Sequence, residues 1–149
     1  MISAPDYIQL YPTVRCNLSC GFCFNRQLPS MEDMSSEAFE ELAGRVQRIG
    51  VRTIDILGGE PTLHRDLPGL VENGVQRGLA INISSNGSDT SQLAEIMRRF
   101  PGVQVGVSVN DHHTADRLKE FIRNHKPVVK TVLGNRLDGS LIETLLSYR

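Results

Sequence analysis

The feature that most constrains the fold is a regular alternation of short apolar segments with amphipathic segments along the 149 residues. Runs rich in β-branched and aromatic residues predict strands, whereas apolar residues recurring at the spacing i, i+3, i+4, i+7 predict helices with one buried face. The pattern predicts five strand–helix units in series. The expected strands cover residues 7–11, 51–57, 79–83, 103–109 and 128–133.

Polar and proline residues predict where these elements begin and end. Ser35, Asp66 and Thr114 are expected to cap the first, second and fourth helices, because their side-chain oxygens can accept from free amides. Pro12 is expected to end the first strand, and Pro127 to end the fourth helix. The apolar faces expected of the five helices are Phe39, Leu42, Ala43, Val46 and Ile49; Leu67, Leu70, Val71 and Val75; Leu93, Ile96, Met97 and Phe100; Ala115, Leu118, Phe121 and Ile122; and Leu141, Ile142, Leu145 and Leu146.

Serial units of this kind predict an α/β fold with one parallel sheet, because each connection is long enough to hold a crossover helix. Right-handed crossovers wound in one direction curl such a sheet toward a barrel. Five units cannot close an eightfold barrel, so we expect an open partial (β/α) barrel, TIM-barrel-like, in a single domain over residues 1–149. Periodicity alone does not separate this fold from a doubly wound sheet.

Composition narrows the classes of function. The formal net charge is −1 and the isoelectric point about 6.4, so no diffuse basic surface is available to bind a nucleic-acid backbone or an anionic membrane. No apolar stretch approaches the roughly 20 residues that a membrane span needs. Residues 1–6 lack the basic and apolar blocks of a secretory signal. A cytoplasmic protein is therefore expected.

The three cysteines of the chain lie within eight residues, in the spacing C-x3-C-x2-C of Cys16, Cys20 and Cys23. An odd number of clustered cysteines makes a disulfide framework a poor interpretation and a soft-metal site a natural one. Iron–sulfur clusters are generally held by four cysteines, so a cluster here would keep one iron without a protein ligand. A zinc site completed by a histidine, and three ordinary buried thiols, remain alternatives.

Three later segments place polar or glycine residues at the ends of expected strands. Gly58-Gly59-Glu60-Pro61 follows the second strand, Ser84-Ser85-Asn86-Gly87 is expected as a loop after the third, and Ser108-Val109-Asn110 ends the fourth. Glycines let the main chain approach a ligand, and Glu60 can accept hydrogen bonds from an ammonium group or from neighbouring donors. Each segment alone is also typical of an ordinary turn. His64, His112, His113 and Asp111 lie near loop ends and are expected to be solvated.

At these residues the chain resembles the radical S-adenosylmethionine (SAM) superfamily. The hallmark of that family is three cysteines at this spacing with an aromatic residue, here Phe22, just before the third. The family also carries a GGEP segment after the second strand, which matches residues 58–61 in all four positions. The resemblance covers essentially the entire chain and favours the partial barrel.

The resemblance implies a site at the carboxyl ends of the strands. Cys16, Cys20 and Cys23 would ligate three irons of one [4Fe–4S] cluster, and the amino and carboxylate groups of S-adenosyl-L-methionine would chelate the fourth. The backbone near Phe22 would approach the adenine. The remaining contacts to SAM implied by the family lie at Gly58, Gly59, Glu60 and Pro61 for the amino group, and at Ser85, Asn86, Ser108 and Asn110 for the carboxylate and ribose.

The implied activity is reductive cleavage of SAM to a 5′-deoxyadenosyl radical, which abstracts hydrogen from an unknown substrate, either a small molecule or a peptide. A reductant such as flavodoxin or ferredoxin would supply the electron. The family's barrel usually has six units, so a homo-oligomer, a partner or a further segment is expected to cover the open sheet edge. The alternatives are a non-catalytic module that binds cluster or SAM, and a zinc-stabilised structural or interaction protein.

Overall fold

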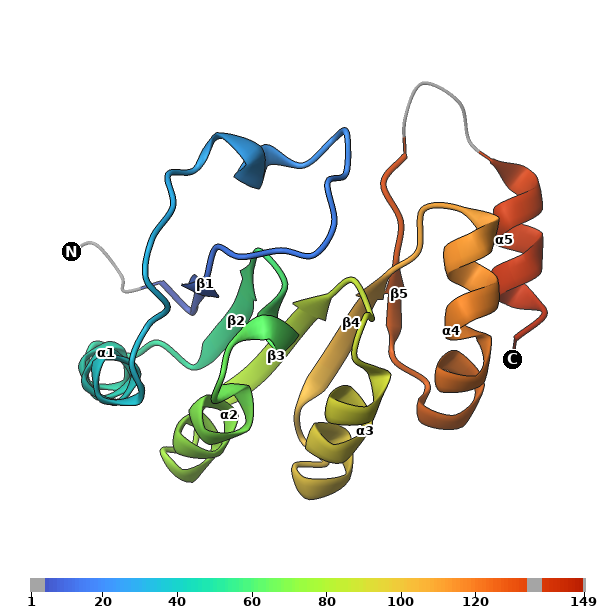
Figure 1. The fold of residues 1–149 in the computed structure, drawn as a ribbon. Helices are drawn as coiled ribbons and strands as arrows, with labels where there is room; N and C mark the ends of the chain where they lie inside the picture. The colour runs from blue at the N-terminus through green and yellow to red at the C-terminus, as the bar shows by residue number, and fades with distance from the viewer. Residues whose placement is uncertain (1–4, 134–137, 149) are drawn as a thin grey trace.

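The architecture is one sheet of five parallel strands, in a computed structural model that describes residues 5–133 and 138–148. The spatial order β1-β2-β3-β4-β5 equals the order along the chain, so every connection crosses over in the same sense (Figure 1). This confirms the predicted α/β partial barrel. The strands are β1 Tyr7–Thr13, β2 Thr53–Gly58, β3 Ala80–Ser85, β4 Gln104–Ser108 and β5 Val128–Lys130.

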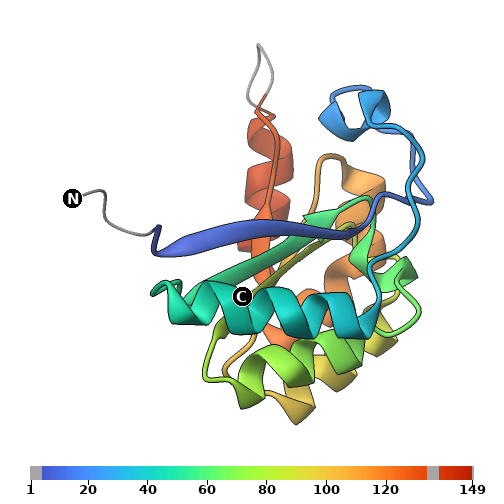
Figure 2. The same ribbon diagram turned by 90° about the vertical axis from the view of Figure 1, so that its left-hand side faces the viewer.

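The helices lie along one face of the sheet, and the long loop that follows β1 rises on the other side, beyond the carboxyl end of β1 (Figures 1 and 2). No helix in the described part of the chain has both the length and the apolar character that crossing a membrane requires. The helices are α1 Ser36–Arg48, α2 Leu67–Gln76, α3 Thr90–Arg99, α4 His112–His125 and α5 Gly139–Leu146, with short 3-10 helices η1 Phe24–Gln27 and η2 Pro61–Leu63.

The core lies between the sheet and the helices. Strand residues alternate in direction, so Ile54 and Ile56 of β2 and Ile81 and Ile83 of β3 are buried against the helices, while their neighbours are half-buried or exposed on the opposite face. Most of the predicted helix faces are buried or partly buried against this core. The prediction is wrong at three positions near the carboxyl ends of helices, where the side chains are exposed: Ile49 (59%) after α1, Val75 (36%) in α2 and Leu146 (49%) in α5.

The helix caps follow the predictions at two positions and contradict them at a third. Ser35 accepts from the amide of Ala38, and Asp66 accepts from the amide of Gly69, as expected. Thr114 is not a cap: α4 begins earlier, and Asp111 accepts from the Thr114 amide at 2.7 Å. Two cap-forming residue types lie three positions apart here, and periodicity could not choose between them.

Three predicted strand ends are wrong by two or more residues, and those of β2 and β4 are wrong by one, because Gly58 belongs to β2 and Val109 lies beyond β4. β1 continues through Pro12 to Thr13, which an edge strand tolerates because the missing amide need not pair, and the register shifts between Leu10 and Thr13. Ser84 and Ser85 belong to β3 rather than to the loop that follows it. β5 ends at Lys130, three residues before the predicted end at Leu133.

Candidate functional site

The turn after β2 packs directly against the main chain that leads into the cysteine loop. A Cβ atom on Gly59 would lie well inside the van der Waals radius of the Arg15 carbonyl oxygen, and one on Gly58, whose φ is +120°, would collide with the Thr13 carbonyl. The Gly59 amide donates to Thr13 O at 2.9 Å, and the Glu60 amide donates to Arg15 O at 2.7 Å. Because neither position has room for a Cβ atom, only two consecutive glycines allow the two segments to come this close. The contact fixes the backbone just before Cys16.

The Glu60 side chain is buried, with 1% exposure, and both of its oxygens are engaged by protein donors. Oε1 accepts from the Thr62 amide at 3.1 Å, the Thr62 hydroxyl at 2.8 Å and the Ser85 hydroxyl at 2.7 Å. Oε2 accepts from the Asn86 amide at 2.6 Å. Of the two roles predicted for Glu60, the structure shows the one with neighbouring donors: the carboxylate joins the ends of β2 and β3.

The cysteine loop carries three free thiols, with Cys16 exposed and Cys20 and Cys23 partly exposed. The Cys23 amide donates to Cys20 O at 3.1 Å, which folds the second half of the loop into a turn. Within residues 5–133 and 138–148, no three Cys, His, Asp or Glu side chains are gathered for one metal ion. Three thiols on one short loop still supply the soft donors that an iron–sulfur cluster requires, so the residue types fit the implied group.

Arg15 fastens both ends of the cysteine loop to the turn after β2. Its guanidinium forms an ion pair with Asp33 and donates to the Leu63 carbonyl at 2.5 Å. The hydrogen bond from Arg15 holds the pKa of the Asp33 carboxyl below its usual range, so the carboxylate stays ionised at neutral pH. Neither residue was predicted to belong to the site, because their meeting depends on the path of the whole loop.

His64 is a second anchor, and the prediction that it is solvated is wrong. The ring is buried, with 2% exposure. Nε2 lies 2.8 Å from the Met34 carbonyl and Nδ1 lies 3.2 Å from the Asp66 amide, so the ring donates from Nε2 and accepts at Nδ1. His64 thereby joins the exit of the cysteine loop to the start of α2. The same expectation is confirmed for Asp111, His112 and His113, which are exposed at the start of α4.

The end of β3 contacts the cysteine loop directly. Asn86 Nδ2 donates to Asn17 Oδ1 at 2.8 Å, and the Asn86 side-chain oxygen accepts from the Ser88 amide. The Ser85 hydroxyl, which donates to Glu60, accepts from the Gly87 amide at 2.9 Å. The structure therefore brings together the cysteine loop, the GGEP segment and the predicted Ser85-Asn86 segment.

The remaining predicted residues lie further along the same edge. Ser108 is half-buried at the end of β4, and Asn110 Oδ1 accepts from the Val132 amide at 2.8 Å. No hydrogen bond found among the described residues links either of them to the cysteine loop. Phe22 is 54% exposed, and neighbouring apolar side chains of the loop are exposed as well.

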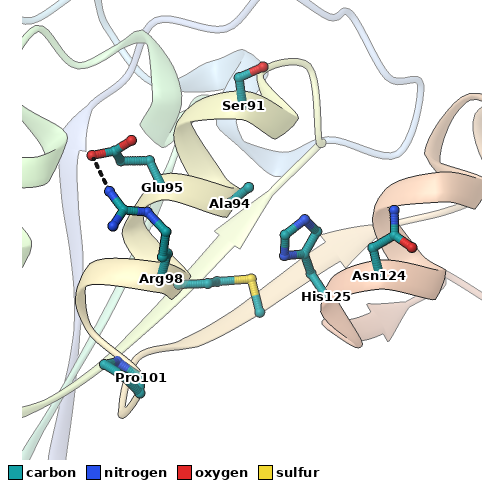
Figure 3. Close-up of a pocket in the computed structure, with 8 residues that line it drawn as sticks. Ser91, Ala94, Glu95, Arg98, Pro101, Asn124 and His125 are labelled. Atoms are coloured by element: carbon teal, nitrogen blue, oxygen red, sulfur yellow. Dashed lines mark hydrogen bonds and ion pairs between the residues drawn. The ribbon is translucent and has the colours of Figure 1, made fainter.

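One hollow adjoins the cysteine loop, and another lies among the helices of the described part of the chain. A largely apolar cavity of about 320 Å³ lies between β1 and η1, lined by residues including Tyr11, Phe24 and Met31. A larger, open hollow of about 600 Å³ runs along α3, from Ser91 in its first turn to Pro101 just after it, and reaches His125 at the carboxyl end of α4 (Figure 3). None of the residues that line this hollow belongs to the cysteine loop.

Comparisons with known proteins give the family of the chain. A family model described as the Radical SAM superfamily matches residues 10–133. A probable GTP 3',8-cyclase of Archaeoglobus fulgidus is 32% identical over 104 residues, which cover 69% of this chain and 35% of that protein. A GTP 3',8-cyclase of Listeria monocytogenes serovar 1/2a is 30% identical over 129 residues, covering 79% of this chain and 37% of that protein. The chain spans about a third of the length of these curated relatives.

Solved structures share the fold. Streptococcus suis SuiB bound to the precursor peptide SuiA superposes with a TM-score of 0.82 at 20% identity, covering 99% of this chain and 37% of that one. Native anSMEcpe with bound AdoMet gives a TM-score of 0.68 at 22% identity, covering 85% of this chain and 44% of that one. At these identities the likeness concerns the fold.

The burial of Glu60 predicts that Glu60→Gln destabilises the protein. Both oxygens of Glu60 accept hydrogen bonds, whereas the side-chain nitrogen of glutamine can only donate. In Glu60→Gln that nitrogen would therefore face another donor, and a buried polar group would lose its hydrogen bond at a cost of about 1–3 kcal/mol in the free energy of unfolding. Urea unfolding of the wild type, Glu60→Gln and the exposed control Glu41→Gln measures this cost. A Glu60→Gln curve that coincides with the control would contradict the proposed junction.

The ion pair of Arg15 and Asp33 predicts a pH-dependent anchor. Because the hydrogen bond from Arg15 lowers the folded pKa of Asp33 below its ordinary value of 3.8, the contribution of the ion pair to stability is complete at neutral pH and is lost as the pH falls below that ordinary value and through the lower folded pKa. Hydrogen exchange at the Met34 amide, which donates to Pro12 O at 2.8 Å, reports this loosening. In Asp33→Asn, the Met34 amide should exchange faster than in the wild type already at neutral pH. If acid accelerated the exchange of this amide equally in Asp33→Asn and in the wild type, the assignment of the effect to Asp33 would be refuted.

Proposed function

Because the chain belongs to the radical SAM superfamily, we propose that it binds one [4Fe–4S] cluster through Cys16, Cys20 and Cys23, with SAM at the same edge of the sheet. The observation that carries this proposal is the junction of the cysteine loop with the GGEP segment. The carbonyls of Thr13 and Arg15 accept from the Gly59 and Glu60 amides, so the loop with its three free thiols starts from a fixed backbone.

To bind the cluster, the three cysteines must be deprotonated. Thiolates rather than thiols ligate iron, so each of the three must lose its proton when the cluster is inserted. Three ligands leave one iron open to SAM, since the chain holds three cysteines. When bound, the reduced cluster supplies the electron that cleaves SAM to methionine and a 5′-deoxyadenosyl radical, which removes a hydrogen atom from the substrate.

The hydrogen bonds of the site divide the proposed SAM contacts into two kinds. The carboxylate of Glu60 and the hydroxyl of Ser85 are already engaged within the protein, so their role is to position the turn. The SAM amino group is assigned to the main chain of residues 58–61, and the adenine to the main chain at Phe22. Asn86, Ser108 and Asn110 remain the proposed contacts for the carboxylate and the ribose. The hydrogen bonds of the Asn86 and Asn110 side chains are exposed, so they can be exchanged for bonds to SAM, whereas those of Glu60 and Ser85 with each other are buried.

Membership of the family does not identify the substrate or the electron donor. Relatives of this chain are GTP 3',8-cyclases, and a protein of like fold binds a precursor peptide, so a small molecule or a peptide is proposed. With all three cysteines of this chain assigned to one cluster, a reductant such as flavodoxin or ferredoxin is proposed as the source of the electron. A cytoplasmic location suits that donor, and a second copy or a partner is proposed to cover the free edge of β5.

Anaerobic reconstitution with iron and sulfide, followed by dithionite reduction, tests the proposal. The reduced wild-type chain is expected to give the EPR signal of a [4Fe–4S]⁺ cluster, SAM is expected to change that signal, and 5′-deoxyadenosine should form. Cys16→Ala, Cys20→Ala and Cys23→Ala should each lose the signal, because each removes one of the three ligands.

Ser19→Ala is the matched control, since it alters the same exposed loop without removing a thiol. Its cluster and its response to SAM should equal those of the wild type. A folded wild-type chain that assembles no cluster would overturn the proposal, and one that holds zinc instead would favour a structural site. A cluster that binds SAM without cleaving it would favour a non-catalytic module.

A further inference from the structure

The face of the sheet opposite the crossover helices carries several polar side chains near its centre, in contrast to the core face. Asp55 of β2 and Asn82 of β3 are paired in register, and Asn82 Nδ2 donates to Asp55 Oδ1 at 2.6 Å. Ser84 lies two residues beyond Asn82 and therefore faces the same side. Its neighbour Ser85 faces the other way, toward buried Glu60. Polar side chains thus continue from the candidate site onto the open face.

Lys130 extends across this face from the outermost strand. Its Nζ lies 2.5 Å from Ser84 Oγ, although β4 separates the two strands that carry them. The lysine passes over Gly106 of β4, where a Cβ atom would lie 2.5 Å from Lys130 Cε and 2.9 Å from Nζ. Glycine weakens a strand interior, so its presence at 106 is explained by the room that the lysine needs.

The ammonium group of Lys130 retains unused binding capacity. An ammonium group has three donor protons, and the hydrogen-bond partner of this one is the neutral hydroxyl of Ser84. None of the ion pairs among the described residues includes Lys130, while Asp55 on the same face is engaged by Asn82. A cation held next to a hydroxyl, and ion-paired with no carboxylate among the described residues, is suited to a phosphate or carboxylate group of a ligand.

We propose that Lys130 and Ser84 bind an oxyanion of the substrate, so that the substrate of this chain is an anionic molecule. The inference rests on the proposed function, because it places that substrate on the open face beside the SAM site. Asp55 and Asn82 supply a hydrogen-bond acceptor and donor further along the same face. Gly106 acts as a positioning residue by leaving the path of the lysine open.

Calorimetric titration of the reconstituted, SAM-loaded chain tests the site. Pyrophosphate and glutarate serve as probes, and the one that binds distinguishes a phosphate from a carboxylate ligand. Lys130→Gln is expected to weaken that binding about tenfold or more, the usual effect of losing a hydrogen bond to a charged group. Gly106→Ala keeps every charge but displaces the flexible end of Lys130, and it should weaken binding in the same direction.

Lys126→Gln is the matched control, since it removes the same charge at the carboxyl end of α4, where the strands begin. Its affinity for the probe should equal that of the wild type.

Failure of both probes to bind, or equal losses of probe affinity in Lys126→Gln and Lys130→Gln, would overturn the inference. So would a Lys130→Gln variant whose EPR response to SAM is weakened while probe binding is intact, because the lysine would then serve SAM. A wild type that binds the probe through Lys130 but assembles no cluster would instead refute the proposed function alone.

Discussion

The close approach of the Gly58-Gly59 turn to the end of β1 is the constraint on which the rest of the site depends. Two carbonyls at the end of β1, those of Thr13 and Arg15, accept from the amides of Gly59 and Glu60, at a separation that no larger side chain allows. This contact fixes where the cysteine loop starts. It also places Glu60 where its buried carboxylate can accept from the end of β3, so three neighbouring strands meet at one polar junction.

Within that junction, anchoring and chemistry fall to different residues. Arg15 and His64 hold the entrance and exit of the cysteine loop through hydrogen bonds to Asp33, Leu63, Met34 and Asp66. The thiols between these anchors remain at least partly exposed and free. A scaffold whose own hydrogen bonds are satisfied can hold a loop of reactive donors without competing for them, which suits a loop that receives an inorganic cluster.

Sequence periodicity predicted the five-stranded parallel sheet, because the apolar pattern of strands and helices depends on local burial. It also placed the GGEP segment and the cysteine loop at one edge, since parallel strands end together. It could not predict the partners of Glu60, the burial of His64 or the ion pair of Arg15 and Asp33. Those contacts join residues 18 to 30 positions apart through the particular course of loops that have no periodic signal. Lys130 and Gly106 were missed for the same reason.

The most direct test of the junction is the iron content and EPR signal of reconstituted Gly59→Ala, measured per folded chain. The added methyl group would collide with the Arg15 carbonyl and displace the start of the cysteine loop, while the helices and the rest of the sheet are untouched. Gly102→Ala is the matched control, because a Cβ there meets no atom within 4 Å. The junction predicts that Gly59→Ala keeps its circular dichroism but loses most of its cluster, whereas Gly102→Ala keeps both. A Gly59→Ala chain with the cluster content of the wild type would contradict it.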